Sequence, residues 1–130
     1  MIRSIIALIG GFAIMVFLVF LLTIAVAAAF GATDGTLGTP YIVASLALSA
    51  AAALTGGYAT ASLAPGRPLA HTIGLVVMVV AMTLSSLGHP QAGLPAWYPV
   101  AIAVIEPLFV LAGGGLRLRQ RRSRTLSPAP

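Results

Sequence analysis

Apolar residues fill four long stretches of the chain, and short segments rich in glycine, proline and polar residues separate them. The stretches cover about residues 4–30, 41–64, 69–88 and 96–116. Each can cross a hydrocarbon core of about 30 Å, which takes about 20 helical residues. The first stretch exceeds the apolar region of a cleaved signal peptide, about 7–15 residues, so we interpret it as a span. The pattern predicts an all-α integral membrane protein, a four-helix transmembrane bundle within residues 1–116.

Small residues recur every four positions in the second apolar stretch, where they form two neighbouring stripes. One stripe consists of Ser45, Ser49, Ala53, Gly57 and Ala61, and the other of Ala52, Gly56, Thr60 and Ala64. Helices in lipid associate by close packing, and small side chains let their backbones approach each other. We therefore expect the second helix to lie at the centre of the bundle.

The third and fourth stretches carry further packing candidates. Gly74, Met78, Met82 and Ser85 fall at helical spacing and predict the packing face of the third helix. The run Gly113-Gly114-Gly115 near the end of the fourth stretch lacks the lysine and the preceding strand of a phosphate-binding loop. The run therefore favours close helix packing or a flexible helix end.

The connecting segments contain residues typical of helix ends. Gly31 and the following Asp34-Gly35 predict the end of the first helix and a turn. Thr39 predicts a cap before Pro40, which suits the first helical position of the second helix. Residues 65–68 predict a tight turn, which makes the second and third helices an antiparallel pair.

Charge is scarce and one-sided. With 59% hydrophobic residues, seven arginines and two acidic residues, the composition excludes a soluble domain, which carries about 25% charged residues. All the arginines can lie on one side of a membrane crossed four times, and arginine is enriched in cytoplasmic segments. The sequence therefore predicts that both termini are cytoplasmic. The arginines are Arg3, Arg67, Arg117, Arg119, Arg121, Arg122 and Arg124.

Both membrane surfaces have candidate anchors. The arginine-rich tail, residues 117–130, directly follows a span, so we expect it to contact anionic lipid headgroups rather than nucleic acid. From Ser123 onward its composition predicts little regular structure. Tyr41, Trp97 and Tyr98 are expected in the opposite headgroup layer, where aromatic side chains gather.

Glu106 is the only formally charged residue inside an apolar stretch, and it lies near the middle of the fourth. A charged side chain at the bilayer centre costs about 2.5–3.5 kcal/mol on insertion scales, and such residues are functional candidates. The polar residues nearest to it in depth are Ser49, Thr55 and Thr83.

Three interpretations of Glu106 stay open. It binds and releases a proton or another cation, or it contacts another subunit, or it stabilises the bundle from within. In the last case a neutral Glu106 donates a hydrogen bond, for example to the Ala103 carbonyl, which Pro107 leaves without its usual helical partner.

Other chemistry finds little support. His71 and His89 lie near opposite ends of the third stretch, and a bis-histidine haem would need partners from another helix that this chain lacks. No histidine and carboxylate cluster has metal-ligand spacing. Cysteine is absent, and Asp34 in a loop is the only aspartate, so no catalytic triad is expected. We expect no catalytic residue, no metal and no cofactor.

Turn, packing and interface residues form a recurring set along nearly the whole chain. They are Thr39-Pro40-Tyr41, Gly56-Gly57-Tyr58, Ala64-Pro65-Gly66-Arg67-Pro68 with His71, Pro95-Ala96-Trp97-Tyr98 and Gly113-Gly114-Gly115-Leu116-Arg117. This set resembles that of a group of small four-span bacterial membrane proteins for which we know no assigned function. The resemblance implies a multi-pass protein of the bacterial inner membrane, and it implies no active site.

Two functions of different class follow from these observations. Spans poor in polar residues favour a non-catalytic accessory or structural subunit that packs against a larger inner-membrane complex, respiratory or photosynthetic. The alternative is a small oligomeric ion- or proton-coupled transporter or channel that uses Glu106. The expected partners are the lipid bilayer and other membrane-protein subunits, or further copies of this chain.

Overall fold

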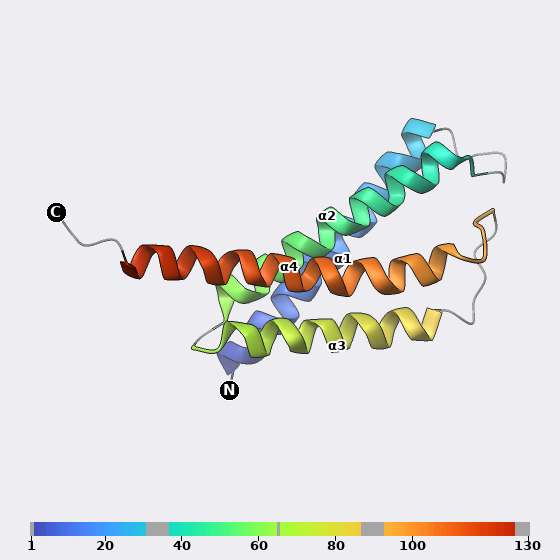
Figure 1. The fold of residues 1–130 in the computed structure, drawn as a ribbon. Helices are drawn as coiled ribbons and strands as arrows, with labels where there is room; N and C mark the ends of the chain where they lie inside the picture. Colours follow the sequence, from blue (N-terminus) through green and yellow to red (C-terminus); the bar gives the residue numbers. More distant parts are fainter. Residues whose placement is uncertain (1, 31–36, 65, 87–92, 127–130) are drawn as a thin grey trace.

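The chain forms four long helices in a computed structural model that describes residues 2–30, 37–64, 66–86 and 93–126 (Figure 1). The helices are α1 (Ile2–Phe30), α2 (Thr39–Leu63), α3 (Pro68–Ser86) and α4 (Tyr98–Leu126). All four are long and apolar enough to cross a membrane. The predicted all-helical fold with four candidate spans is thus confirmed.

Some helix ends differ from those predicted. The N-cap of α2 is Gly38 rather than Thr39, and its carbonyl accepts a bond from the Ile42 N–H at 3.2 Å. Thr39 is already helical, and Pro40 lies in the first turn as expected. The predicted cap at Gly31 and turn at Asp34-Gly35 lie outside the described residues.

α4 does not end near Leu116 but continues as a helix to Leu126. Leucine, arginine and glutamine are good helix formers, and they dominate this extension. Contacts with α2 also hold it: the Tyr58 hydroxyl donates to Gln120 Oε1 at 2.8 Å, and the Arg117 guanidinium lies 5.6 Å from the Tyr58 ring centroid. We expected little regular structure from Ser123 onward. That expectation is wrong for residues 123–126, which belong to α4.

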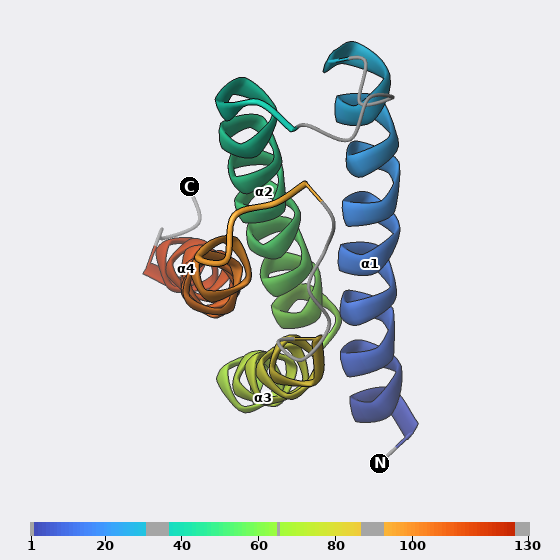
Figure 2. The ribbon, with the colours of Figure 1, turned by 90° about the vertical axis from the view of Figure 1, so that its right-hand side faces the viewer.

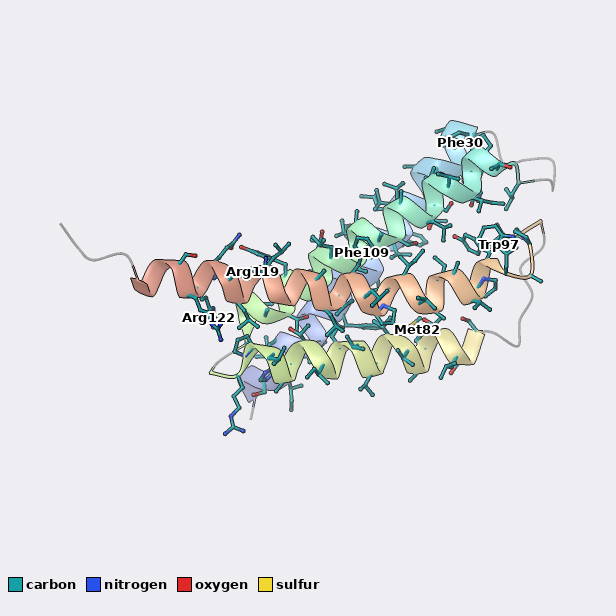
Figure 3. All side chains as sticks on the ribbon, viewed as in Figure 1. Phe30, Met82, Trp97, Phe109, Arg119 and Arg122 are labelled. Atoms are coloured by element: carbon teal, nitrogen blue, oxygen red, sulfur yellow. The ribbon has the colours of Figure 1, made fainter. Side chains whose placement is uncertain are left out.

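The helices form two inclined pairs. α1 and α2 run side by side, α3 and α4 run side by side, and the pairs diverge toward one end of the molecule (Figures 1 and 2). α2 contacts all three other helices, so it lies at the centre as its small residues predict. Figure 3 shows Arg119 and Arg122 at one end and Trp97 at the other. We call these the arginine end and the tryptophan end.

Two glycines bring α2 and α4 into backbone contact. A Cβ atom at Gly57 would collide with the Val110 carbonyl oxygen, and one at Gly113 would collide with the Leu54 carbonyl oxygen. The two contacts are reciprocal, because each helix supplies one glycine and one carbonyl. No larger residue permits this approach, and in lipid such packing supplies much of the association energy.

The same kind of contact joins the other neighbours of this crossing. A Cβ atom at Gly56 of α2 would lie 2.8 Å from Met15 Cβ of α1. Gly11 of α1 faces the Thr60 side chain, and Gly114 of α4 faces the Thr72 side chain of α3. All these contacts lie in the half of the bundle toward the arginine end.

The predicted packing face of α3 is right at Gly74, which faces Leu8 of α1, but not at its far end. Met82 is 58% exposed and Ser85 is also exposed, whereas the buried stripe consists of Thr72, Leu75, Val79 and Thr83. Buried threonines are tolerated there because their hydroxyls bond within the helix. Thr72, for example, donates to the Pro68 carbonyl at 3.0 Å.

We expect Gly57→Ala to destabilise the protein by about 1–3 kcal/mol, because the added methyl group forces α2 and α4 apart. Unfolding free energy in bicelles or the melting temperature in mild detergent measures this. Gly115→Ala is the matched control, since no neighbouring atom lies within 4 Å of its added Cβ. Equal stability of the two variants would contradict the assignment of Gly57 to the helix crossing.

Candidate functional site

The Glu106 side chain lies inside the bundle rather than on its surface. The residue is only 9% exposed and occupies the turn of α4 before Pro107, which remains within the helix. It lines two separate hollows of the bundle. The interpretation in which Glu106 points out of the subunit is therefore not supported.

A polar cavity of about 230 Å³ extends from Glu106 toward the tryptophan end. Tyr41, Ser45 and Ser49 of α2 line one wall, and Tyr98 of α4 lines another. α1 closes the third side with apolar residues and one threonine, and Leu94 of the preceding loop also lines the space. A polar space of this size holds several water molecules, because one water needs about 10–15 Å³ by this kind of measure.

Thr83 of α3 is the polar neighbour of Glu106 from the opposite side. Its hydroxyl lies within hydrogen-bonding reach of the Glu106 carboxyl and donates its own proton to the Val79 carbonyl at 2.9 Å. The Thr83 oxygen keeps lone pairs that can accept a hydrogen bond from a protonated carboxyl.

Aromatic residues frame the mouth of the polar cavity. The Tyr98 hydroxyl reaches the Ser45 side chain across the gap between α4 and α2. Trp97 stands edge-on to Tyr98 with ring centroids 6.4 Å apart, and it is 54% exposed. Tyr98 thus lines the cavity, whereas the neighbouring Trp97 ring is exposed.

A second hollow meets Glu106 from the other side. It is a groove of about 730 Å³ between α1 and α3, with Ile102 and Glu106 of α4 at its base. Phe12, Met15, Val16 and Phe20 are among the α1 residues that line it, with Val79 and Met82 among those of α3. Its lining is mostly apolar, in contrast to that of the polar cavity.

Toward the arginine end the bundle is closed below Glu106. Val110 and Leu75 are fully buried there, and Ala53 is fully buried on α2. The backbone contacts of Gly57 and Gly113 lie in the same region. The site is thus open toward the tryptophan end and sealed toward the arginine end.

The structure separates the polar residues that the sequence grouped with Glu106. Thr83 adjoins it, and Ser49 lines the same cavity. Thr55 does not belong to the site: it is exposed, and its hydroxyl donates to the Ala51 carbonyl at 2.8 Å. It lies six residues after Ser49, about 1.7 helical turns, which puts it on another face of α2.

The small residues of α2 lie in two different surroundings. Ala53, Gly57 and Ala61 are buried against neighbouring helices, as is Gly56 of the second stripe. Ser45 and Ser49 instead line the polar cavity, because α2 has by then diverged from α4. The four-residue spacing predicts that Ser45 and Ser49 lie on the same face of α2 as Gly57. It does not predict that this face borders a cavity at the two serines.

Sequence analysis did not assign Tyr98 or Thr23 to the site. Tyr98 was expected only as an interfacial anchor, yet it also lines the cavity, as does Tyr41. Thr23 of α1 lines both hollows, with its hydroxyl bonded to the Val19 carbonyl at 2.7 Å. As the only hydroxyl in the outer half of the first stretch, Thr23 carried a signal that could have been used.

The remaining candidates lie away from the site. The His71 ring nitrogen Nδ1 pairs with the Arg67 carbonyl at 2.8 Å near the start of α3, and His89 lies outside the described residues. Arg119 and Arg122 are exposed on the extension of α4. Within the part of the chain that the structure describes, no three histidine or carboxylate residues are grouped as a metal site requires.

No family model, curated protein or solved structure matches this chain. The resemblance to small four-span bacterial membrane proteins therefore stays a prediction. Any functional proposal depends on the geometry around Glu106.

We expect a cysteine at Ser49 to react with a small water-soluble thiol reagent, because the polar cavity connects it to the tryptophan end. A cysteine at Ala53, one turn further along α2, is the matched control and should stay unreactive, since Ala53 is fully buried. The chain has no native cysteine, so each labelling result concerns one position. Similar reactivity at both positions would show that the cavity does not end at the helix crossing.

Proposed function

We propose that this protein is a small ion- or proton-coupled membrane transporter in which Glu106 binds the cation. The observation that carries the proposal is a buried carboxyl set between two hollows, with no cationic side chain beside it in the described residues. The nearest arginine along α4 is Arg117, eleven residues away, which corresponds to about 16 Å of helix.

Glu106 lacks an oppositely charged partner among the residues that line the two hollows. An unpaired buried charge is costly, and in proteins such a group is neutralised by a proton or paired with an opposite charge. The described residues that line the two hollows include no opposite charge for Glu106, but the hollows leave space for one. We therefore assign the role of partner to a proton or a cation from outside the protein. Their alternation at one carboxyl is the chemistry of an exchanger.

The asymmetry of the bundle suits alternating access. The site communicates with the tryptophan end and is sealed toward the arginine end by the glycine crossing. In the transport cycle that we propose, α2 and α4 rock about this crossing, so that the tryptophan end closes as the arginine end opens. Pro107 favours such a motion because it removes one helical hydrogen bond of α4 next to the site.

The orientation belongs to the same proposal. We place the arginine end in the cytoplasm of a bacterial inner membrane, with both termini inside, because of the arginine distribution. Trp97 and Tyr41 then lie in the outer headgroup layer. The polar cavity would face the outside of the cell, and the α4 extension would lie among anionic headgroups.

An accessory-subunit role is the second candidate, and one observation favours it. Bulky apolar side chains of α1 are more than half exposed on the bundle. Those most exposed are Ile5, Ile6, Ile9, Phe17, Phe20 and Ile24. This face suits a larger membrane partner as well as it suits lipid. The role ranks second because it leaves the two hollows at Glu106 unexplained. Neither candidate function is enzymatic.

We expect dicyclohexylcarbodiimide, an apolar reagent that attacks protonated carboxyls, to modify Glu106 in the purified protein. Peptide mass spectrometry reads the modification, and Glu106→Gln should lose it while keeping the wild-type melting temperature. A cation that binds Glu106 should slow the reaction in proportion to its occupancy, and its flux into proteoliposomes should vanish in Glu106→Gln. Modification that no cation slows at any concentration would count against a cation site.

The proposed orientation predicts one-sided labelling. A cysteine at Ala96, which is exposed near the tryptophan end, should react with a membrane-impermeant maleimide added to intact cells, whereas a cysteine at Ser123 should react only after the membrane is opened. Each cysteine variant is the control for the other, because the two positions should react from opposite sides of the membrane. The reverse pattern would invert the topology, and the polar cavity would then face the cytoplasm.

Purification in mild detergent from the native membrane separates the two candidate functions. A monomer or small homo-oligomer supports the transporter. Stoichiometric recovery with a large complex, unchanged in Glu106→Gln, would favour the accessory subunit.

A further inference from the structure

We infer that the cation bound at Glu106 is an amphipathic organic cation, whose apolar part lies in the groove between α1 and α3. This inference rests on the proposed function and specifies its ligand. It follows from the way the two hollows meet, from their linings and from the direction in which the groove opens.

The two hollows meet at a common set of side chains. Val19, Thr23, Ile102 and Glu106 line both of them. A molecule whose charge lies at Glu106 can therefore extend into the apolar groove while its charged group still faces the polar cavity. The arrangement matches a molecule with one charged and one apolar part.

Glu106 offers too few ligands for a metal cation. Hard cations such as Ca²⁺ take about six to eight oxygen ligands. The described residues that line the two hollows supply one carboxyl and otherwise only neutral hydroxyl groups, so a hard cation would need water to complete its ligand shell. An organic ammonium or phosphonium ion needs only one counter-charge and apolar surroundings, which this site provides.

The groove has the size and lining of a ligand site. Its volume of about 730 Å³ falls within the range of about 300–1,000 Å³ seen for drug-sized ligands. Two phenylalanines and two methionines contribute to its walls. Methionine adapts to differently shaped apolar groups, and aromatic rings attract cations through their faces.

The groove opens sideways toward lipid rather than toward water. Its walls, α1 and α3, are both candidate spans, and they diverge from a contact between Leu8 and Gly74 near the arginine end (Figures 1 and 2). Met82 on one rim is 58% exposed and Phe20 on the other is 64% exposed. An amphipathic cation dissolved in the bilayer can thus reach Glu106 without passing through the polar cavity. The polar cavity remains free for water and protons.

Calorimetric titration of the protein in lipid nanodiscs tests this inference, with empty nanodiscs as the baseline. The probes are tetraphenylphosphonium and tetramethylammonium, which carry the same charge but differ in apolar surface. We expect tetraphenylphosphonium to bind at least about tenfold more tightly, a difference of about 1.4 kcal/mol. Glu106→Gln should abolish binding of both probes.

The groove itself is tested by Met82→Trp, which fills space between α1 and α3. Its matched control is Val77→Trp on the same helix, because Val77 is 63% exposed and is not among the groove residues. We expect Met82→Trp to weaken tetraphenylphosphonium binding about tenfold or more while leaving tetramethylammonium unchanged. Val77→Trp should change neither.

The outcomes separate this inference from the proposed function. Equal affinity for both probes, lost in Glu106→Gln and unaffected by Met82→Trp, would overturn the inference and leave the cation site standing. Binding of tetraphenylphosphonium that persists in Glu106→Gln would overturn the inference, because the cation would then only partition into lipid or the groove. If no cation of any kind protects Glu106 from the carbodiimide, the proposed function fails as well.

Discussion

The contact between the backbones of α2 and α4 is the constraint on which the rest of the structure depends. Gly57 and Gly113 let each helix touch a main-chain carbonyl of the other, closer than any side chain would allow. Two straight helices that touch at one point and cross at an angle must separate on both sides of it. On one side the tyrosine and arginine contacts of the α4 extension hold them together. On the other side they diverge, and the space between them becomes the polar cavity.

The carboxyl of Glu106 occupies the first position at which this divergence leaves room for a polar group. One turn nearer to the crossing, Val110 is fully buried and no space remains. One turn further out, Ile102 lines both hollows. The depth of Glu106 is thus fixed by helix geometry. Its chemistry is fixed by the lack of a cationic neighbour among the described residues, since a carboxyl left alone in apolar surroundings requires a partner from elsewhere.

The sequence predicts the fold well and the site only in part. Hydropathy finds all four helices, and the four-residue spacing of small residues identifies α2 as the central helix. The spacing at Met78 and Met82 misleads, because in lipid a large apolar residue is as stable facing outward as inward. The packing face of α3 therefore leaves no hydropathy signal. Glu106 stands out from its charge alone, but Tyr98 and Thr23 join it only through tertiary geometry. The continuation of α4 past Leu116 agrees with its helix-forming residues, but the contact with Tyr58, 62 positions before its partner Gln120, cannot be predicted from the sequence.

A single helix carries both Glu106 and the arginine segment, and α4 is long enough, at 29 residues, to reach well beyond the bilayer. Any change in the tilt of this helix is therefore felt at both places. Thermodynamic linkage then makes the coupling reciprocal. If the ligand at Glu106 prefers one tilt, a second ligand that binds the arginines in the same tilt raises the affinity of Glu106 for the first ligand. The first ligand raises the affinity of the arginines for the second by the same factor. In the orientation that we propose, the lipid charge of the inner leaflet would then affect binding at Glu106, about 16 Å away along α4.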